Sequence, residues 1–222
     1  MQFETARVAM VESQIRPNGV RDVRILDAFA SLAREKFVPE HQKALAYIDE
    51  ALPIVPATSS SPGRYLLPPM ALARMLQFAA PLPSERALDI GGVTGYSAAI
   101  LSHLCKKVDA LEASESLANG MRKCLASAGI TGVEVRAGPL QNGLDASKPF
   151  DLILMNGAVS EEPKELLSQL SEGGRLVTIV RKGWLGHATL FTKAAGAISG
   201  RAIFDAGAEY LPGFEPKPQF VF

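Results

Sequence analysis

The residues best placed to do chemistry lie in one glycine-rich turn, and they are Asp89, Gly91, Gly92 and Gly95. The turn follows a short apolar run, 87–90, and precedes a segment, 96–104, whose apolar residues recur at helical spacing. In a strand, turn and helix of this order, glycines let a ligand approach the backbone of the turn closely. The N-terminus of the helix then offers its free N–H groups to the same ligand. The pattern favours a nucleotide-like ligand, although glycine is also the ordinary residue of any tight connection.

Two polar residues are expected at the same edge of the sheet. Glu112 follows the next expected strand, about seventeen residues beyond Gly95, where a carboxylate accepts hydrogen bonds from both hydroxyls of a ribose. The alternative is a surface glutamate at the start of the following helix, for which Ser114 also serves as a cap. Asn156 follows a third apolar run, 150–155, and its alternative role is in a turn.

The elements that must position these residues alternate along the chain. Expected strands are 87–90, 107–111, 133–137, 150–155 and 175–180, and expected helices are 69–78, 96–104, 115–128 and 163–170, the last capped by Gly173 and Gly174. The runs 188–193 and 201–206 suggest an antiparallel hairpin that closes the sheet. The prediction is therefore an α/β fold with a doubly wound, mostly parallel sheet.

The first 80 residues are expected to form a helical extension packed on a main domain of residues 81–222. Its expected elements are helices over 3–15 and 21–33, an extended segment at 51–54 and a loop at 55–64 that is rich in small residues and proline. A serine cluster in this loop, Ser59, Ser60 and Ser61, is best interpreted as part of a surface loop, because no fixed base lies near it in sequence.

Composition excludes several classes of protein. The 23 Lys and Arg residues balance 23 Asp and Glu residues, so no nucleic-acid or membrane partner is expected. The two cysteines and three histidines share no metal-ligand spacing, and the chain start has no secretory pattern, which predicts a cytoplasmic protein with reduced thiols and no metal. One interpretation of the 47% hydrophobic content and the apolar end, 219–222, is a contact in a homo-oligomer.

Motifs along nearly the whole chain resemble the protein-L-isoaspartate O-methyltransferase family of S-adenosylmethionine-dependent enzymes. They include Lys36-Phe37-Val38-Pro39-Glu40, Leu52-Pro53-Ile54, Ala73-Arg74-Met75, the turn 89–96, Pro149 to Leu154, Glu162-Pro163 and 170–174. The resemblance implies a Rossmann-like class I methyltransferase with a seven-stranded sheet, parallel but for one strand. It also implies that Asp89, Gly91, Gly95 and Glu112 bind the cofactor, and we expect Gly92, Gly138 and Asn156 to belong to the same site.

Three departures from the family pattern affect the implied site. Leu67 stands where the family has a serine implicated in methyl transfer, which leaves the catalytic residue unknown, with the serines at 59–61 as weak substitutes. Val93 replaces a central glycine and tolerates positive φ poorly. Pro139 replaces an acidic residue expected to accept a hydrogen bond from the adenine amino group. We therefore expect weak binding of S-adenosylmethionine, or its loss.

Two hypotheses follow from the resemblance and its departures. In the first, the chain is an S-adenosylmethionine-dependent methyltransferase with an acceptor other than an isoaspartyl protein, since methyl transfer depends mainly on proximity and alignment. In the second, it is a non-catalytic relative with a degraded cofactor site, kept for binding or structure. The retained glycines and Glu112 favour the first.

Overall fold

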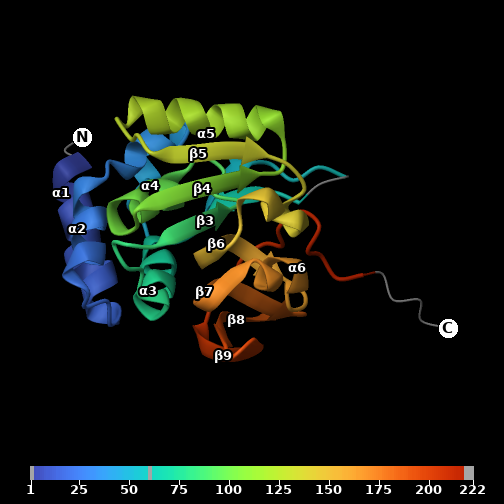
Figure 1. The fold of residues 1–222 in the computed structure, drawn as a ribbon. Coiled ribbons are helices and arrows are strands. Elements are labelled where there is room, and N and C mark those ends of the chain that lie inside the picture. The colour runs from blue at the N-terminus through green and yellow to red at the C-terminus, as the bar shows by residue number, and fades with distance from the viewer. Residues whose placement is uncertain (1–2, 60–61, 218–222) are drawn as a thin grey trace.

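A computed structural model of the chain describes residues 3–59 and 62–217. Among these residues, seven strands form one sheet in the order β5-β4-β3-β6-β7-β8-β9 (Figure 1). Their bounds are Arg86–Ile90 (β3), Lys107–Glu112 (β4), Val133–Ala137 (β5), Phe150–Val159 (β6), Leu170–Lys182 (β7), Leu185–Ala194 (β8) and Ala197–Asp205 (β9). Within this sheet β8 runs antiparallel to both of its neighbours and the other pairs are parallel, which confirms the predicted fold class.

Two short strands form a separate antiparallel pair that reaches the edge of the main sheet. They are β1, Leu52–Val55, and β2, Arg64–Leu66, and Leu52 pairs with Leu66. Arg64 therefore begins a strand, whereas the sequence placed it in a loop. Because successive side chains of a strand point to opposite sides, the pairing fixes the directions of Arg64 and Tyr65.

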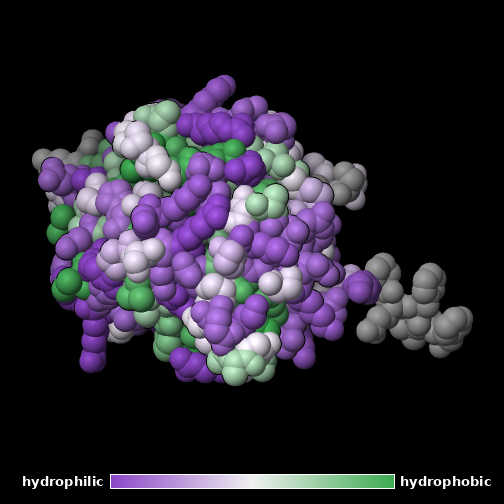
Figure 2. All heavy atoms as spheres, viewed as in Figure 1, coloured by the Kyte–Doolittle hydropathy of each residue, from purple (hydrophilic) through white to green (hydrophobic). Residues whose placement is uncertain are grey.

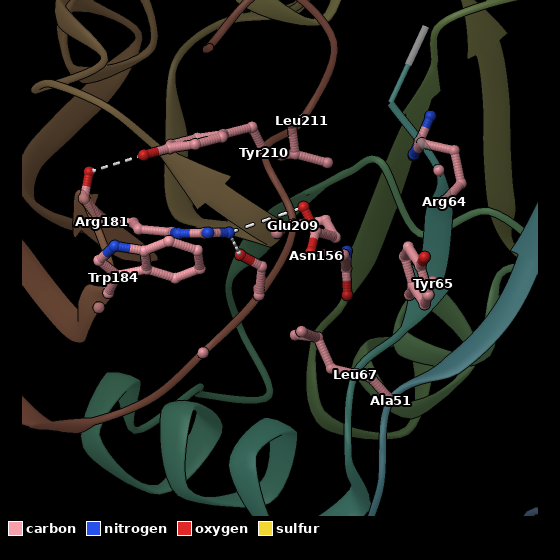
Figure 3. Close-up of a pocket in the computed structure, with 15 residues that line it drawn as sticks. Ala51, Arg64, Tyr65, Leu67, Asn156, Arg181, Trp184, Glu209, Tyr210 and Leu211 are labelled. Atoms are coloured by element: carbon pink, nitrogen blue, oxygen red, sulfur yellow. Dashed lines mark hydrogen bonds and ion pairs between the residues drawn. The ribbon is translucent and has the colours of Figure 1, made fainter. Parts of the chain in front are cut away.

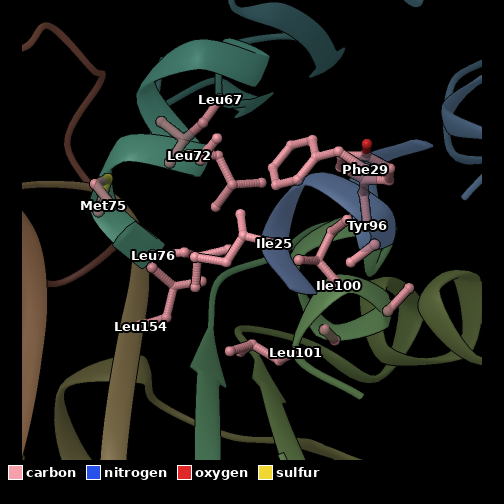
Figure 4. Close-up of a cluster of buried hydrophobic side chains, with 14 of the residues drawn as sticks. Ile25, Phe29, Leu67, Leu72, Met75, Leu76, Tyr96, Ile100, Leu101 and Leu154 are labelled. Atoms are coloured by element: carbon pink, nitrogen blue, oxygen red, sulfur yellow. The ribbon is translucent and has the colours of Figure 1, made fainter. Parts of the chain in front are cut away.

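Six α-helices of the described residues surround the sheet, and their bounds are Phe3–Met10 (α1), Val23–Ser31 (α2), Pro69–Ala79 (α3), Tyr96–Leu104 (α4), Glu115–Ser127 (α5) and Lys164–Ser168 (α6). Helix α4 packs on β4, and α5 packs on β4 and β5. Helix α2 packs against α4 (Figure 1). Buried side chains of α2, α3 and α4 interlock around Ile25, Leu76 and Ile100 (Figure 4).

The proposed division at residue 80 stays a prediction. The interlocked cluster draws on both sides of that boundary, since Phe29 of α2 packs edge-on against Tyr96 of α4, with ring centroids 6.0 Å apart. At about 25 cal/mol for each Å² of apolar surface removed from water, such shared burial stabilises both parts together.

Several element ends differ from the prediction for local reasons. The first helix continues after Met10 as a π-helical turn, 11–15, and stops at Gly19, whose φ is 85°. Gly173 and Gly174 do not cap α6, because they lie inside β7, which begins at Leu170. The predicted hairpin of β8 and β9 is confirmed, but its turn is shorter than expected, since only Ala195 and Gly196 separate the strands and both have positive φ.

The surface seen in Figure 2 is mainly hydrophilic, with hydrophobic residues scattered among polar ones. Within residues 3–59 and 62–217, no helix combines the length and the hydrophobicity needed to cross a bilayer. The apolar end at 219–222, interpreted above as a contact in a homo-oligomer, lies outside the described residues.

Candidate cofactor site and adjoining cavity

The glycine-rich turn joins β3 to α4 at the carboxyl edge of the sheet, as the sequence predicted. Gly91 and Gly95 have φ values of 71° and 90°, which only glycine adopts freely. Val93 has a φ of 55° and is 2% exposed. A β-branched residue in this region is strained by about 1–3 kcal/mol. Val93 therefore takes up the positive φ that the sequence predicts it to tolerate poorly.

Asp89 lies beneath the turn and explains why residue 92 is glycine. A Cβ at Gly92 would lie 2.2 Å from Asp89 Oδ2, so no other residue fits there. Asn156 Nδ2 donates to Asp89 Oδ1 at 2.8 Å, and the Ser97 hydroxyl donates to Oδ2 at 3.0 Å. Complete burial, with a smaller contribution from the nearby Glu112 carboxylate, raises the pKa of Asp89 to about 7 in spite of these hydrogen bonds.

Glu112 is fully buried at the end of β4, and both of its carboxylate oxygens are occupied. Backbone N–H groups of Val93 and Ala113 donate to Oε1 and Oε2, at 2.6 and 3.0 Å. Arg64 donates from Nη2 to Oε1 at 3.0 Å and from Nη1 to Oε2 at 3.1 Å. Ser114 caps the following helix by accepting from Leu117 N–H, so Glu112 is free of the capping role.

Side chains of this chain also cover the glycines of the turn. Arg64 Nη2 donates to the Gly91 carbonyl at 2.8 Å. A Cβ at Gly91 would lie 2.8 Å from Leu211 Cδ2, and one at Gly157 would lie 2.7 Å from Leu211 Cγ. Main-chain hydrogen bonds between Ala158 and the segment 209–211 hold Leu211 there.

The residue types suit an adenosyl group, but this conformation does not admit one at Glu112. A ribose diol needs two acceptor positions on that carboxylate, and Arg64 holds both positions that the backbone leaves. Arg64 is itself only 4% exposed, so the ion pair closes the position to solvent as well.

A cavity of about 360 Å³ adjoins the turn (Figure 3). Figure 3 shows Arg181, Trp184 and Tyr210 on one side and Tyr65 and Leu67 on the other, with Asn156 between them. The Arg181 guanidinium lies 5.0 Å from the Tyr210 ring centroid and donates to the Ala208 carbonyl at 3.0 Å. Trp184 is 98% exposed at the turn between β7 and β8.

The remaining predicted site residues fall in different places. Asn156 is at the edge of the cavity, but it lies inside β6 at an irregularity of the pairing with β7, not in a turn after the strand. Gly138 follows β5 and donates its N–H to the Glu112 carbonyl at 2.9 Å, and Pro139 beside it is exposed. Gly95 faces α5, where a Cβ would meet Met121 Cγ at 2.8 Å.

The weak catalytic candidates gain no support from their positions. Leu67 lines the cavity as a buried apolar side chain, and its carbonyl accepts from Arg34 Nη2 at 2.9 Å. Ser59 is an exposed turn residue, while Ser60 and Ser61 lie outside the described residues. Within the described residues, no cluster of three or more His, Cys, Asp or Glu side chains could hold a metal ion.

Sequence reasoning missed the importance of Arg64, Arg181 and Leu211. Arg64 and Glu112 are far apart in sequence, and no local pattern pairs them. The one available signal is an arginine that follows a Pro-Gly pair and begins an apolar run, Tyr65 to Leu67. It was hidden because charged residues next to an apolar strand are usually solvated.

Comparisons with known proteins agree on one family. The family model for Protein-L-isoaspartate(D-aspartate) O-methyltransferase matches residues 6–212. A curated Protein-L-isoaspartate O-methyltransferase from Koribacter versatilis (strain Ellin345) is 36% identical over 203 residues, which are 91% of this chain and 89% of that relative.

Two solved structures show the same fold at lower identity. One, a protein-L-isoaspartate O-methyltransferase, has a TM-score of 0.81 at 24% identity over 96% of this chain and 66% of that longer chain. Another, described as such an enzyme from Plasmodium falciparum in complex with S-adenosyl-L-homocysteine, has a TM-score of 0.77 at 19% identity over 91% and 96%.

The sheet, the turn and these matches define the class as a Rossmann-like, S-adenosylmethionine-dependent methyltransferase. Within that class, the chain belongs to the protein-L-isoaspartate O-methyltransferase family. The predicted family and class of enzyme are confirmed.

Proposed function

We propose that this chain transfers a methyl group from S-adenosylmethionine to a carboxylate of a protein or peptide acceptor that binds in the Arg181 cavity. The observation that carries the proposal is the position of this cavity, which lies beside the turn and is lined by Asn156 from the site and by Arg181 from the opposite wall. Its volume of about 360 Å³ is that of a small-ligand pocket.

The cavity wall suits an acidic acceptor. Arg181 brings a cation that is held by the Gly183 and Ala208 carbonyls and by the Tyr210 ring. It also pairs with the exposed Glu209 carboxylate at 3.6 Å, which an acceptor carboxylate would have to displace. Such a cation attracts a carboxylate and fixes its direction by paired N–H donors. Trp184 offers an exposed apolar face at the same wall, against which a peptide packs.

The proposal that the acceptor carboxylate is not that of an isoaspartyl residue is based on Leu67. The family serine is replaced by a buried apolar side chain that lines the cavity, and on this ground we propose an acceptor other than an isoaspartyl residue. The relatives named above do not favour a different acceptor, so the proposal depends on this substitution. They also give no support to a non-catalytic role.

Transfer of labelled methyl groups tests both the proposed activity and the proposed change of acceptor. We expect little transfer to an isoaspartyl peptide and measurable, base-labile transfer to carboxylates in a mixture of cellular proteins. Arg181→Ala is expected to raise the KM for the acceptor at least about tenfold. Arg136→Ala, which removes an exposed arginine at β5, is the control and should leave KM unchanged.

Efficient methylation of the isoaspartyl peptide would refute the altered acceptor and leave the carboxylate methyltransferase in place. Absence of transfer to every carboxylate tested, with bound cofactor verified, would refute the proposed activity itself.

A further inference from the structure

The Arg64 guanidinium resembles a ribose diol in the way it meets Glu112. It directs two donors side by side, one to each carboxylate oxygen, at 3.0 and 3.1 Å. The hydroxyls of a ribose offer the same pair of donors to the same two acceptor positions. Each Glu112 oxygen also holds one backbone N–H, from Val93 or Ala113, so the carboxylate keeps its orientation whichever donor pair occupies its outer side.

From this geometry, and on the basis of the proposed function, we propose that Arg64 is a built-in competitor for the ribose position, which must leave Glu112 before the cofactor binds. The two occupants exclude each other, because no lone pair of the carboxylate is left for a second pair of donors. The apparent affinity for the cofactor is thereby the intrinsic affinity multiplied by the fraction of molecules in which the Arg64–Glu112 ion pair is open.

The structure offers the displaced side chain a place to go. Arg64 lines the cavity next to the turn, and the cavity also holds the Glu209 carboxylate, which is 55% exposed and lies 3.6 Å from Arg181. A rotation of the arginine side chain toward the cavity would turn it into the space that this second carboxylate also lines. The main chain of β2 keeps its pairing with β1 in such a rotation, since only side-chain torsions change.

Titration calorimetry with adenosylhomocysteine tests the competition. We expect Arg64→Ala to bind at least about tenfold more tightly than the wild type, and Arg64→Gln to show a smaller gain because its amide still donates to Glu112. The gain should be clear with adenosine and much smaller with 2′,3′-dideoxyadenosine, which lacks both ribose hydroxyls.

A matched control is an arginine that pairs with another carboxylate of β4. Asp109 of β4 is also fully buried and paired with an arginine, Arg86, toward the opposite end of the strand. Arg86→Ala, or Arg86→Lys where the alanine variant does not fold, should leave the Kd for adenosylhomocysteine within about twofold of the wild type. Melting curves check that each variant is folded, and Arg64→Gln provides the test where Arg64→Ala is unfolded.

The possible results separate this proposal from the proposed function. Equal or weaker binding by folded Arg64 variants overturns the competition but not the enzyme. An equal gain with dideoxyadenosine also overturns it, because the ribose hydroxyls would then be irrelevant. Tighter binding by Arg64→Ala without methyl transfer to any acceptor supports the competition and refutes the proposed function. Absence of binding by every variant overturns both.

Discussion

Two positions of β4, Asp109 inside the strand and Glu112 at its end, each carry an acidic residue paired with an arginine, in different settings. Asp109 and Glu112 are both fully buried, and each is paired with an arginine. Asp109 receives Arg86 on Oδ2 alone, and its Oδ1 has no hydrogen-bond partner within the described residues. Glu112 receives four donors, two from the backbone and two from Arg64.

This difference separates an ion pair that the fold needs from one that can be replaced. Arg86 also donates to the Ser147 carbonyl and stacks on Phe150 at 5.0 Å, so it ties strand starts together. Arg64 instead borders a cavity. Its partner Glu112 remains held by the main-chain N–H groups of Val93 and Ala113 even without the arginine. Because the backbone already orients the Glu112 carboxylate, another pair of hydrogen-bond donors can take the place of the Arg64 guanidinium there.

The largest expected effect is a difference in stability between the two arginine variants. Arg86→Ala should lower the free energy of unfolding by about 3–5 kcal/mol, because Asp109 is left buried without a partner. Arg64→Ala should cost less, about 1–3 kcal/mol, because Glu112 keeps two backbone donors. Urea denaturation measures both, and equal losses would show that the two positions of β4 do not differ in this way.

The pH dependence of stability should reveal the buried acid at the carboxyl edge. Because the pKa of Asp89 is raised from 3.8 to about 7 in the folded protein, its contribution is complete below about pH 4 and is lost as the pH rises through 7. We expect the free energy of unfolding to fall by about 2–4 kcal/mol over this range, and Asp89→Asn to remove that fall. Glu134→Gln, at an exposed carboxylate, is the control. An unchanged slope in Asp89→Asn would contradict the expectation.

Relief of strain in the turn should have an intermediate effect. Val93→Gly removes a β-branched residue from positive φ, which is worth about 1–3 kcal/mol, less about 1 kcal/mol for the greater freedom of glycine in the unfolded chain. The Val93 N–H to Glu112 is kept, so adenosylhomocysteine should bind at least as tightly as before. Thermal unfolding and calorimetry measure the two effects, and a lower melting temperature would mean that the valine side chain stabilises more than its backbone strain costs.

The smallest expected effect concerns the adenine end of the site. Pro139→Asp introduces the acidic residue that the family resemblance predicts at this position, and we expect a gain of about 1 kcal/mol in binding, or several-fold in Kd. The gain should add to that of Arg64→Ala, because the residues act on different parts of the ligand. Calorimetry of the double variant checks this sum, and a gain present only with Arg64 removed would mean that the two positions are coupled.

Sequence patterns predicted most of the fold and the region of the site. Strand β5 and helix α4 have the expected bounds, because each has a periodic apolar pattern between clear turn signals. The strand β6 runs past its apolar core through Asn156 and Gly157, since pairing partners, not composition, decide where a strand ends.

The state of the site was beyond the reach of local patterns. The fold places Asp89, Gly91 and Glu112 at one edge of the sheet. Arg64 pairs with Glu112 and Leu211 covers Gly91, and both contacts depend on how distant segments of the chain fold back. An ion pair that joins residues 48 positions apart leaves no periodic trace in the sequence. The strain at Val93 could be foreseen, because it follows from one residue type in one kind of turn.

Trp184 gives the chain a built-in optical reporter. It is the one tryptophan of the sequence, and it stands almost wholly in water at the wall of the Arg181 cavity. Its fluorescence therefore begins with the red-shifted emission of a hydrated indole. Any acceptor that packs against it will shift the emission to the blue without a label, so the arrival of the acceptor can be followed in real time separately from that of the cofactor.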